Sequence, residues 1–583
     1  MKAKQSAQIL LRDARNGRWL AFREPLEIVV ANNIDDVLPA LEKVQTATTS
    51  GKFAAGFISY EAAPAFDPAF RTYFDTNFPL LFFGIFSQPE VVELPEISAN
   101  FSLDWQVTTA FEKYQSAIAH IKSAIARGDT YQVNYTIRQI AGFSGDPLAL
   151  FSAIAADAPF AAFIDLPDFT ICSASPELFF EKCGKEIISR PMKGTAARGR
   201  TFAEDLQLRD FLATSEKDRA ENAMIVDMIR NDIGRIAATG SVAVRDAFRI
   251  EKYPTVWQMT TTVTGQTDVS ISEIFRAMFP CASITGAPKI RTMQIIADIE
   301  DTPRKIYTGT IGFISPDGDA QFNVAIRTAV IDKRNGRIEY GIGSGVVWDS
   351  DAAQEYQECR VKARVIVKPQ QKPDFSLLES LRWSPDSGYF LCDAHIRRMY
   401  DSAAYFDFPF DETAIRRSLA NIANSLPKAL HKVRLLLFRN GGIFCEAAKI
   451  SDIDPQSPLK IALAAKPVDS SDPFLFHKTT HRAVYATAKA AAPHADDVLL
   501  WNERGEITEG CIYNVLVKVD GEWFTPPVDC GLLNGTYRQY LLDCGDIRER
   551  IILKDELANA EEIVLINSVR KWRNAVLVGS TYR

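Results

Sequence analysis

The sequence lacks the features of a membrane or secreted protein. No stretch approaches the roughly 18–20 uninterrupted apolar residues of a membrane-spanning helix. Residues 1–11 do not form the apolar core of a signal peptide and run directly into charged Arg12 and Asp13. The nine cysteines contain no Cys-x-x-Cys pair, which argues against both disulfides and a zinc site. We therefore expect a cytoplasmic protein whose thiols are reduced.

A clustered basic stripe is also absent. The net charge is -7, and residues of both signs are scattered along the chain. A nucleic-acid-binding surface would need lysines and arginines gathered on one face. Chemistry on a small molecule, with neither nucleic acid nor membrane as a partner, is the better expectation.

The chain of 583 residues is too long for one hydrophobic core, because single cores stop growing near ~250–300 residues. The clearest boundary is the polar stretch after Val367, which is bracketed by Pro369 and Pro373. We predict a first domain over residues 1–368, a linker over 369–374 and a second domain over 375–583.

Both predicted domains mix strand and helix patterns. Runs rich in β-branched and other apolar residues predict strands at 170–180, 308–314 and 322–331. Apolar residues at helical spacing predict helices at 114–127, 216–231 and 352–365. The fold class expected for the whole chain is therefore α+β.

Two of these predicted helices carry paired carboxylates. Asp218 and Glu221 are spaced i,i+3 on one helix, and Glu355 and Glu358 repeat the spacing on another, so each pair projects from one face. Such pairs could converge on a magnesium ion, which prefers oxygen ligands. The spacing alone is more often typical of solvated helix faces paired with nearby lysines and arginines.

Five short motifs occur along the first domain. They are Ser-Pro-Glu at 175–177, Arg-Pro-Met-Lys-Gly-Thr at 190–195, Arg-Asn-Asp-Ile-Gly-Arg at 230–235, Ser-Ile-Thr-Gly-Ala-Pro-Lys at 283–289 and Gly-Ile-Gly-Ser-Gly at 341–345. In these motifs the sequence resembles the chorismate-utilising enzymes, which include anthranilate, isochorismate, salicylate and aminodeoxychorismate synthases. The resemblance covers roughly residues 53–367 and implies a fold of large antiparallel sheets flanked by helices.

Lys193 makes this resemblance more specific. A lysine here is similar to that of aminodeoxychorismate synthase component I, because anthranilate synthases lack it. Replacing the C4 hydroxyl of chorismate by an amine without moving the double bonds requires two allylic displacements. A lysine amine can add at C2 as water leaves C4, and ammonia then enters at C4 and expels the lysine. Lys193 must be uncharged to attack, so we expect desolvation or a neighbouring cation to lower its pKa.

The resemblance also implies residues that hold chorismate, whose two carboxylates need cationic or backbone donors. The implied substrate-binding residues are Tyr307, Arg327, Ser283, Gly341 and Gly343. The carboxylates implied to position magnesium are Asp218, Glu221, Glu355 and Glu358. The glycine run would let main-chain N–H groups approach an anion. It is a poor dinucleotide fingerprint, because Val346 stands where a third glycine belongs.

Two positions depart from the family pattern. Gln258 stands where many relatives carry a histidine, and Cys281 with Ala282 replaces a commoner glycine pair before Ser283. Glutamine does not titrate, so proton transfer at C4 must fall to another residue or to water.

The second domain contains looser motifs in a recognisable order. These are Asp-Ala-His-Ile-Arg-Arg-Met at 393–399, His-Lys-Thr-Thr-His-Arg at 477–482, a glutamate-containing segment at 503–514, Gly-Thr at 535–536 and Asn-Ser at 567–568. With them the sequence resembles the fold-type IV pyridoxal-phosphate enzymes, which implies a domain of two α/β subdomains from about residue 375 to the C-terminus.

This second resemblance implies the residues that hold pyridoxal 5'-phosphate. Lys478 would bind the cofactor covalently, and Glu509 would face the pyridine nitrogen and keep it protonated. Arg398, Thr536 and Ser568 would bind the phosphate. His477 and His481 form an i,i+4 pair, but no third ligand accompanies them, so a zinc site is not predicted.

Taken together, the two resemblances imply synthesis of 4-aminobenzoate for folate. The first domain would aminate chorismate to 4-amino-4-deoxychorismate, and the second would release 4-aminobenzoate and pyruvate. No Gly-x-Cys-x-Gly with a downstream His-x-Glu is present, so ammonia should come from a separate glutamine amidotransferase subunit. Relatives of the second domain commonly dimerise, which implies a possible homodimer.

Two other interpretations stay open from the sequence. The first is an anthranilate or salicylate synthase fused to a domain like the branched-chain or D-amino-acid aminotransferases. The second treats the C-terminal half as a regulatory or scaffolding domain that binds no cofactor.

Overall fold

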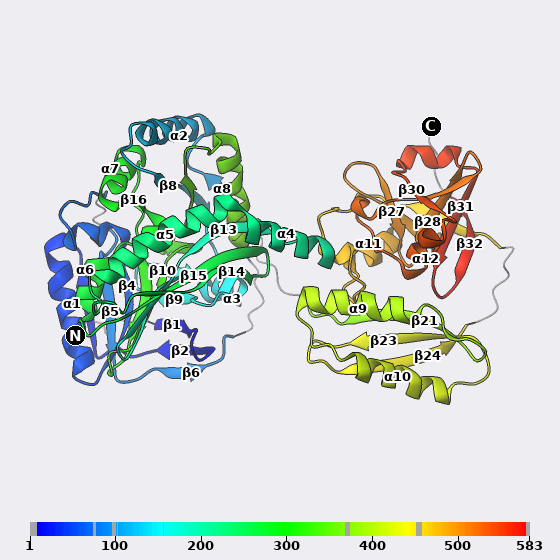
Figure 1. The fold of residues 1–583 in the computed structure, drawn as a ribbon, viewed down its shortest axis with the longest axis horizontal. Helices are drawn as coiled ribbons and strands as arrows, with labels where there is room; N and C mark the ends of the chain where they lie inside the picture. The colour runs from blue at the N-terminus through cyan, green and yellow to red at the C-terminus, as the bar shows by residue number, and fades with distance from the viewer. Residues whose placement is uncertain are drawn as a thin grey trace. The chain divides into compact units, whose positions relative to one another are not determined.

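The computed structural model describes residues 8–73, 77–95, 101, 103–155, 157–367, 373–450 and 457–578, without the side chains of 360–367. The predicted linker at 369–374 falls mostly outside these described residues. The chain forms two units, drawn in Figure 1. Unit 1 contains residues 1–197 and 210–371, and unit 2 contains residues 198–209 and 372–583.

Unit 1 is built on two large antiparallel sheets. The first sheet has the order β16 (Gly286–Ala287), β8 (Gln132–Gly142), β20 (Arg337–Val346), β19 (Thr328–Asp332), β10 (Phe169–Ser173), β9 (Ala162–Asp165), β1 (Gln8–Asp13), β2 (Arg18–Phe22) and β6 (Glu90–Val92), with β7 (Gln106–Val107) on β8. The second has the order β13 (Met192–Ala197), β15 (Val256–Gln266), β12 (Glu186–Arg190), β11 (Leu178–Cys183), β18 (Ala320–Val324), β17 (Thr310–Ile314), β4 (Phe53–Ile58), β5 (Leu81–Phe86) and β3 (Glu27–Ala31), with β14 (Ala243–Lys252) on β15.

The strand runs predicted at 170–180 and 322–331 are confirmed in part, because each run contains two strands that lie in different sheets. β10 lies in the first sheet and β11 in the second, and the chain crosses between them at residues 174–177. It crosses back between β18 and β19, where Arg327 has a φ of 50°. Pro176 cannot donate to a ladder and left-handed backbone interrupts one, which explains the breaks. Both crossings carry predicted motif residues, Glu177 and Arg327.

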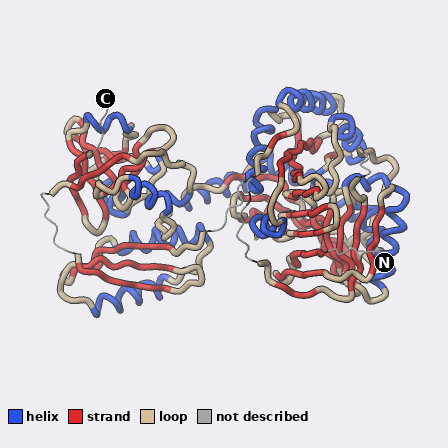
Figure 2. Tube along the Cα trace, turned by 180° about the vertical axis from the view of Figure 1, so that it is seen from behind, coloured by secondary structure: helices blue, strands red, loops and turns tan. Residues whose placement is uncertain are grey.

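Helices cover the sheets of unit 1, and Figure 2 shows them along the outside of the strands. They are α1 (Ile34–Thr49), α2 (Phe111–Ala126), α3 (Pro147–Ala155), α5 (Glu216–Gly234), α6 (Ile271–Met278), α7 (Lys289–Ile299) and α8 (Ala352–Val367), with 3-10 turns η1 (Tyr60–Ala65) and η2 (Ala282–Ile284). The predicted helices at 114–127, 216–231 and 352–365 are confirmed as α2, α5 and α8. α5 begins at Glu216 because the Ser215 hydroxyl accepts a hydrogen bond from the Asp218 N–H.

Unit 2 contains a four-stranded and an eight-stranded sheet. The smaller has the order β22 (Gly388–Tyr389), β21 (Leu377–Ser384), β23 (His431–Leu437) and β24 (Ile443–Lys449). The larger has the order β27 (Ile507–Gly510), β26 (Asp497–Trp501), β25 (Leu459–Leu463), β32 (Lys571–Leu577), β31 (Glu562–Asn567), β28 (Asn514–Val519), β29 (Glu522–Thr525) and β30 (Arg548–Glu549). β25 pairs in parallel with β26 and β32, so this sheet is mixed.

The helices of unit 2 divide between these sheets. α9 (Cys392–Phe406) and α10 (Glu412–Ser425) share one apolar core with the smaller sheet (Figure 1). α11 (Ala483–Ala491) and α12 (Thr536–Cys544) pack with the larger sheet, accompanied by η3 (Pro473–Leu475), η4 (Val528–Cys530) and η5 (Lys554–Asn559). Each sheet has its own core, so the unit comprises two subdomains. α4 (Phe202–Thr214) begins in unit 2 and ends in unit 1.

The α+β class is confirmed by these sheets and helices. All nine cysteines are free thiols, as expected from their spacing. Within the described ranges, no helix combines the length and apolar character that crossing a membrane requires.

Candidate active sites

Lys193 lies in unit 1 on β13, the edge strand of the second sheet. It is half-buried, and its amine faces β20 of the first sheet. A Cβ atom placed on Gly345 would lie 2.6 Å from Lys193 Nζ and 2.3 Å from Gln132 Nε2. A side chain at residue 345 would therefore displace the ends of the Lys193 and Gln132 side chains. The two sheets therefore bring the predicted nucleophile to the predicted glycine run.

Three hydrogen bonds fix the loop that bears Lys193. Gln258 Nε2 donates to the Gly194 carbonyl at 2.8 Å, and Gln258 Oε1 accepts from the Thr195 hydroxyl at 3.0 Å. Asn222 Nδ2 donates to the Lys193 carbonyl at 3.3 Å. Gly194 has a φ of 91°, a conformation that favours glycine. Gln258 therefore acts here as a hydrogen-bonding support for the lysine loop.

Glu177 is a titratable group near Lys193 whose pKa is clearly shifted by burial. Its side chain is 3% exposed and receives a hydrogen bond from Ser283. Burial raises the pKa of the Glu177 carboxyl to about 7, although Ser283 and Lys193 act against this rise. A carboxyl with a pKa near neutrality can both take up and release a proton at the operating pH. Ser283, predicted to bind substrate, lies next to this carboxyl.

The predicted magnesium ligands come only partly together. Burial raises the pKa of Glu221, which lies near Lys193, and the charges of Asp218 and Glu355 raise it further. Asp218 Oδ2 accepts from the Ser215 hydroxyl at 2.5 Å, and Glu355 Oε1 accepts from Ser350 at 2.7 Å.

Glu358 is exposed on α8. Among the residues described, no three His, Cys, Asp or Glu side chains are arranged to hold a metal ion. The oxygen donors suit Mg²⁺ chemically, but they do not form one coordination group, so the magnesium site stays a prediction.

The other predicted substrate residues lie around β20. Tyr307 is buried with its ring against Gly341, where an added Cβ would lie 2.3 Å from the ring. At Gly343 an added Cβ would lie 2.7 Å from the Tyr135 carbonyl on β8. These two glycines therefore serve close packing. Burial raises the pKa of Tyr340 to about 12, and the charge of Arg327 acts against this rise, which places the Arg327 guanidinium near β20.

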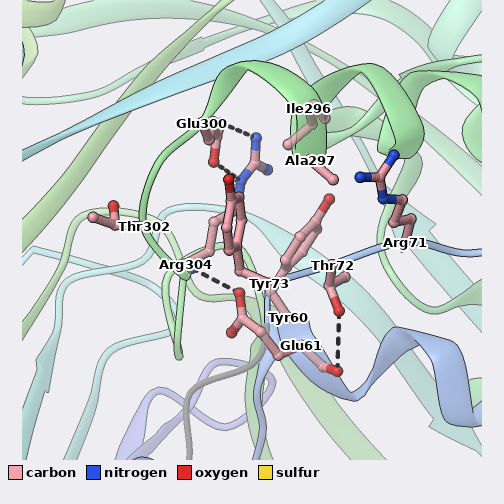
Figure 3. A pocket seen from close by; sticks show the side chains of 10 residues that line it. All are labelled: Tyr60, Glu61, Arg71, Thr72, Tyr73, Ile296, Ala297, Glu300, Thr302 and Arg304. Carbon is pink, nitrogen blue, oxygen red and sulfur yellow. Dashed lines mark hydrogen bonds and ion pairs between the residues drawn. The ribbon is translucent and has the colours of Figure 1, made fainter.

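A separate small cleft in unit 1 lies beside a buried ion pair (Figure 3). Glu61 accepts from the Arg304 N–H at 2.7 Å, and Arg304 pairs with Glu300 at 2.6 Å. Arg304 also donates to the carbonyls of Ile284 and Asn134. None of the predicted site residues lines this cleft. Its charges support the chain next to Ser283 and do not form a second reactive site.

In unit 2, Lys478 is held against β21. The Leu378 N–H donates to the Lys478 carbonyl at 2.9 Å, and Thr479 forms a β-bridge with Leu377. Burial, followed by the charges of Arg398 and Arg482, lowers the pKa of the Lys478 amine to about 8. A much larger fraction of this amine is uncharged near neutral pH than of an ordinary lysine.

Glu509 lies near the Lys478 amine, because their charges influence each other. It is 5% exposed, and its carboxylate accepts from the Tyr485 hydroxyl at 2.7 Å. Burial raises the pKa of Glu509 to about 7. A cationic partner, such as the protonated ring nitrogen of pyridoxal phosphate, would return the group to its charged form.

Arg398 forms a buried network with Glu379 and His395. Arg398 donates to the Glu379 carboxylate at 2.8 and 2.7 Å, and His395 Nδ1 lies 2.6 Å from Glu379 Oε2. The charges of Arg398 and His395 outweigh burial and lower the pKa of Glu379. His395 Nε2 lies 3.2 Å from the hydroxyl of Thr536, which opens α12.

This network fits a phosphate-binding site. Arg398 also donates to the Asn534 carbonyl at 3.0 Å, and two of its five N–H groups remain for a phosphate oxygen. Ser568 lies beside β21, the strand that carries Glu379, and its hydroxyl donates to the Ser380 carbonyl at 3.3 Å. The N-terminus of α12 adds backbone N–H groups and a favourable dipole. The residues present therefore fit pyridoxal phosphate, with Lys478 at the aldehyde, Glu509 at the ring nitrogen and Arg398 at the phosphate.

Several residues of the two sites were not predicted. Gln132 is buried beside Lys193, and within the described part of the chain neither its nitrogen nor its oxygen has a hydrogen-bond partner. Glu379 supports Arg398 and His395, and Tyr485 binds Glu509. The alternation in β21 carries a signal for Glu379, because the glutamate occupies an inward position between Leu377 and Leu381. Gln132 and Tyr485 carry no comparable signal in the sequence.

Comparison with known families supports the division into two enzyme domains. Residues 6–368 match the family described as chorismate binding enzyme, and residues 376–578 match the family described as amino-transferase class IV.

Individual relatives match parts of the chain. Aminodeoxychorismate synthase component 1 of Bacillus subtilis is 40% identical over 273 residues, which cover 46% of this chain and 57% of that protein. Anthranilate synthase component 1 of Neisseria meningitidis is 38% identical over 264 residues, covering 45% of this chain and 53% of that protein. The chain thus spans little more than half the length of these curated relatives.

A solved structure supports the fold of unit 1. The crystal structure of anthranilate synthase component I from Streptococcus pneumoniae aligns with a TM-score of 0.53 at 25% identity. The alignment covers 63% of this chain and 93% of that one. The fold of large antiparallel sheets expected for a chorismate-utilising domain is confirmed.

Proposed function

Since the chain belongs to the chorismate binding enzyme family and carries a class IV aminotransferase domain, we propose that it makes 4-aminobenzoate from chorismate in two steps. The observation that carries this proposal is the position of Lys193, whose amine lies against Gly345 beside the titratable Glu177. A lysine amine is needed there to add at C2 before ammonia enters at C4, whereas direct entry of ammonia at C2 needs no such lysine.

The first step is amination to 4-amino-4-deoxychorismate. Lys193 Nζ forms a bond to C2 while the C4 hydroxyl leaves as water, and ammonia then bonds to C4 while Lys193 leaves C2. The leaving hydroxyl needs a proton and the attacking amine must lose one. Glu177, with a pKa of about 7, is suited to carry that proton. It takes the acid–base role that Gln258 cannot fill.

The second step is elimination of pyruvate by the C-terminal domain. When bound, pyridoxal phosphate supplies an electron sink for an amine attached to it. Lys478, with a pKa of about 8, is suited to remove the proton from C4 of the aminated ring. Loss of the C3 enolpyruvyl group then makes the ring aromatic. Glu509 holds the cofactor nitrogen, and Arg398, Thr536 and Ser568 hold the phosphate.

This assignment for the C-terminal domain rests on its covalent neighbour. A domain that binds amines through a lysine is joined to one that produces a C4 amine, and the same ring is the substrate of both. The lyase reaction consumes that amine, whereas an aminotransferase would need an unrelated amino acid.

The ammonia is proposed to come from a separate glutamine amidotransferase subunit. The relatives named component 1 are consistent with a second component. Purified chain should therefore aminate chorismate with ammonium and fail with glutamine alone. Equal use of both nitrogen sources by the purified chain would overturn this part of the proposal.

Product identification tests the proposal as a whole. The full chain is incubated with chorismate, ammonium, magnesium and pyridoxal phosphate, and the products are separated and identified by mass. We expect 4-aminobenzoate and pyruvate in equal amounts. Anthranilate or salicylate would instead assign unit 1 to the rival chemistry. Accumulation of 4-amino-4-deoxychorismate, with no pyruvate, would remove the lyase from unit 2.

A further inference from the structure

The segment at residues 198–209 follows directly after the strand that bears Lys193, yet it belongs to unit 2. Its first residues form a rigid loop around Asp205. Arg198 donates to both carboxylate oxygens of Asp205, at 2.7 and 2.8 Å, and the Gly199 N–H donates at 2.9 Å. A Cβ on Gly199 would lie 2.2 Å from the Asp205 nitrogen, so only glycine fits.

This loop contacts Tyr405, which lies near the end of α9. The Tyr405 hydroxyl donates to the Gly199 carbonyl at 2.7 Å, and Arg198 donates to the Tyr405 carbonyl at 3.3 Å. The Arg198 guanidinium also lies 4.7 Å from the centre of the Tyr405 ring. The Arg198–Asp205 pair is almost fully buried, at 8% and 2% side-chain exposure. Three interactions therefore join the loop to Tyr405, and three hydrogen bonds join Arg198 and Gly199 to the buried carboxylate of Asp205.

Tyr405 in turn packs against the residue before Lys478. Its ring centre lies 4.4 Å from that of His477, which Phe406 contacts from another direction at 4.8 Å. Ser402 forms a hydrogen bond of 2.9 Å with His477 Nδ1. Burial lowers the pKa of His477 to about 3, against a raising contribution from the Arg200 backbone, so the imidazole is uncharged and packs as a neutral ring.

The lysine segment is thus held from two sides. β21 binds the backbone of Lys478 and Thr479, and α9 fixes the side chain of His477. The α9 side of this arrangement is completed by residues that lie more than 200 positions earlier, since Tyr405 and Arg198 are separated by 207 positions. A catalytic lysine must keep its amine within about half an ångström of its productive position.

We infer that the loop at residues 198–205 is a positioning element of the C-terminal active site, which acts on Lys478 through Tyr405 and His477. This inference rests on the proposed cofactor role of Lys478. It assigns to Arg198, Gly199 and Asp205 no contact with substrate or cofactor. It implies that the cofactor-binding domain is completed by a piece of sequence that the boundary at residue 369 would place in the other domain.

The test uses the full chain and three variants. Tyr405→Leu removes the ring over His477, Tyr405→Phe removes only the hydroxyl bond to Gly199, and Gln207→Ala changes an exposed residue on the same segment as a matched control. Pyridoxal phosphate is titrated into each apo chain, and the pH midpoint of its covalent attachment is recorded by absorption. Hydrogen exchange of residues 476–480 is measured in the apo chains.

We expect Tyr405→Leu to weaken cofactor binding about tenfold or more, and Tyr405→Phe to weaken it about threefold to tenfold, in line with loss of a single buried hydrogen bond. In Tyr405→Leu water should reach Lys478, so the midpoint should move upward from about 8 toward the ordinary lysine value. Hydrogen exchange of the backbone amides of residues 476–480 should be faster in apo Tyr405→Leu than in the unaltered apo chain. Gln207→Ala should match the unaltered chain in all three measurements.

A variant that is merely less stable would unfold at a lower temperature. Its folded fraction would still show the unaltered pH midpoint of covalent cofactor attachment. The inference is overturned if Tyr405→Leu keeps the affinity, midpoint and exchange rates of Gln207→Ala. Failure of the proposed function is distinguishable, because the unaltered chain would then bind no pyridoxal phosphate at Lys478. Amination by unit 1 serves as a folding check, since none of these residues contributes to the Lys193 site.

Discussion

The two lysine sites place the same functional group among different charges. Lys478 lies near two arginines and the carboxylates of Glu379 and Glu509, and burial together with the two cations lowers the pKa of its amine to about 8 against the effect of the carboxylates. Lys193 lies near the carboxyls of Glu177 and Glu221, whose pKa values are raised by burial. Unit 2 therefore lowers the proton affinity of its lysine. Unit 1 instead provides a neighbouring group that can accept the proton.

The difference corresponds to the two proposed reactions. A lysine that binds a phosphate-bearing cofactor works beside cations that also hold the phosphate. A lysine that displaces water needs an acid to protonate the leaving hydroxyl and a base to receive its own proton. One buried carboxyl with a pKa near 7 can serve both needs in turn. The comparison yields predictions that address each lysine separately.

The largest expected effect comes from Glu177→Gln. Glutamine keeps the size and can still accept the Ser283 hydrogen bond, but it carries no proton. Amination should fall by about 10²–10⁴-fold, the usual contribution of general acid–base catalysis, while lyase activity on supplied 4-amino-4-deoxychorismate stays constant. Both rates are measured on the same preparation.

Glu61→Gln is the matched control for this substitution. Glu61 is also a buried carboxyl whose pKa burial raises to about 7, but it lies beside Arg304 in the cleft of Figure 3, away from Lys193. Its variant should retain amination within a few fold. Equal losses in the two variants would mean that buried charge in general, and not the Glu177 position, is what amination requires.

The next effect concerns the pH dependence of unit 2. With a pKa of about 8, Lys478 is mostly charged below pH 7 and mostly neutral above pH 9. Covalent attachment of pyridoxal phosphate to the apo chain should therefore accelerate with rising pH and level off above about pH 9. At pH 7.5 it should be roughly 10²-fold faster than for a lysine of ordinary pKa. A rate that still increases steeply above pH 9.5 would remove the special environment assigned to Lys478.

A smaller effect is expected at Glu509. Glu509→Gln cannot carry the negative charge that pairs with a protonated ring nitrogen. Lyase activity should fall about 10- to 100-fold, as for loss of a hydrogen bond to a charged group, and amination should not change. Tyr485→Phe removes only one hydrogen bond to this carboxylate and should cost about tenfold or less. A larger loss in Tyr485→Phe than in Glu509→Gln would contradict the role given to the carboxylate.

The smallest effect is expected at Gln258. Gln258→Ala removes two hydrogen bonds from the loop that bears Lys193, each worth about 0.5–1 kcal/mol, so amination should fall roughly tenfold. Gln258→His retains one donor and one acceptor and should lose less. If Gln258→His raised the amination rate and changed its pH profile, the histidine would be acting as an acid or base, and Gln258 would be more than a support.

The sequence predicted some residues of the two sites and missed others. Motifs carry information about residues close to one another along the chain, so Lys193, Lys478 and the helices bearing the carboxylates could be predicted from it. The breaks inside two predicted strand runs were missed, because an apolar run does not show where the chain crosses between sheets. The crossings at Glu177 and Arg327 became visible only in the sheet order.

Contacts between distant segments could not be predicted at all. Helical spacing shows that Asp218 and Glu221 share a face, but not how far that face lies from Glu355. The loop at 198–205 reads as part of the first domain, because nothing in its residues identifies Tyr405 as a partner 207 positions away. The role of Glu379 could be predicted more readily from the sequence, since a glutamate at an inward strand position requires a buried cation.

The central claim is that two lysines carry out two consecutive reactions in one chain. The most direct test compares Lys193→Ala, Lys478→Ala and an equimolar mixture of the two, each given chorismate, ammonium, magnesium and pyridoxal phosphate. Lys478→Ala should accumulate 4-amino-4-deoxychorismate, Lys193→Ala should leave chorismate unchanged, and the mixture should produce 4-aminobenzoate. Production of 4-aminobenzoate by either variant alone, or of none by the mixture, would contradict the account.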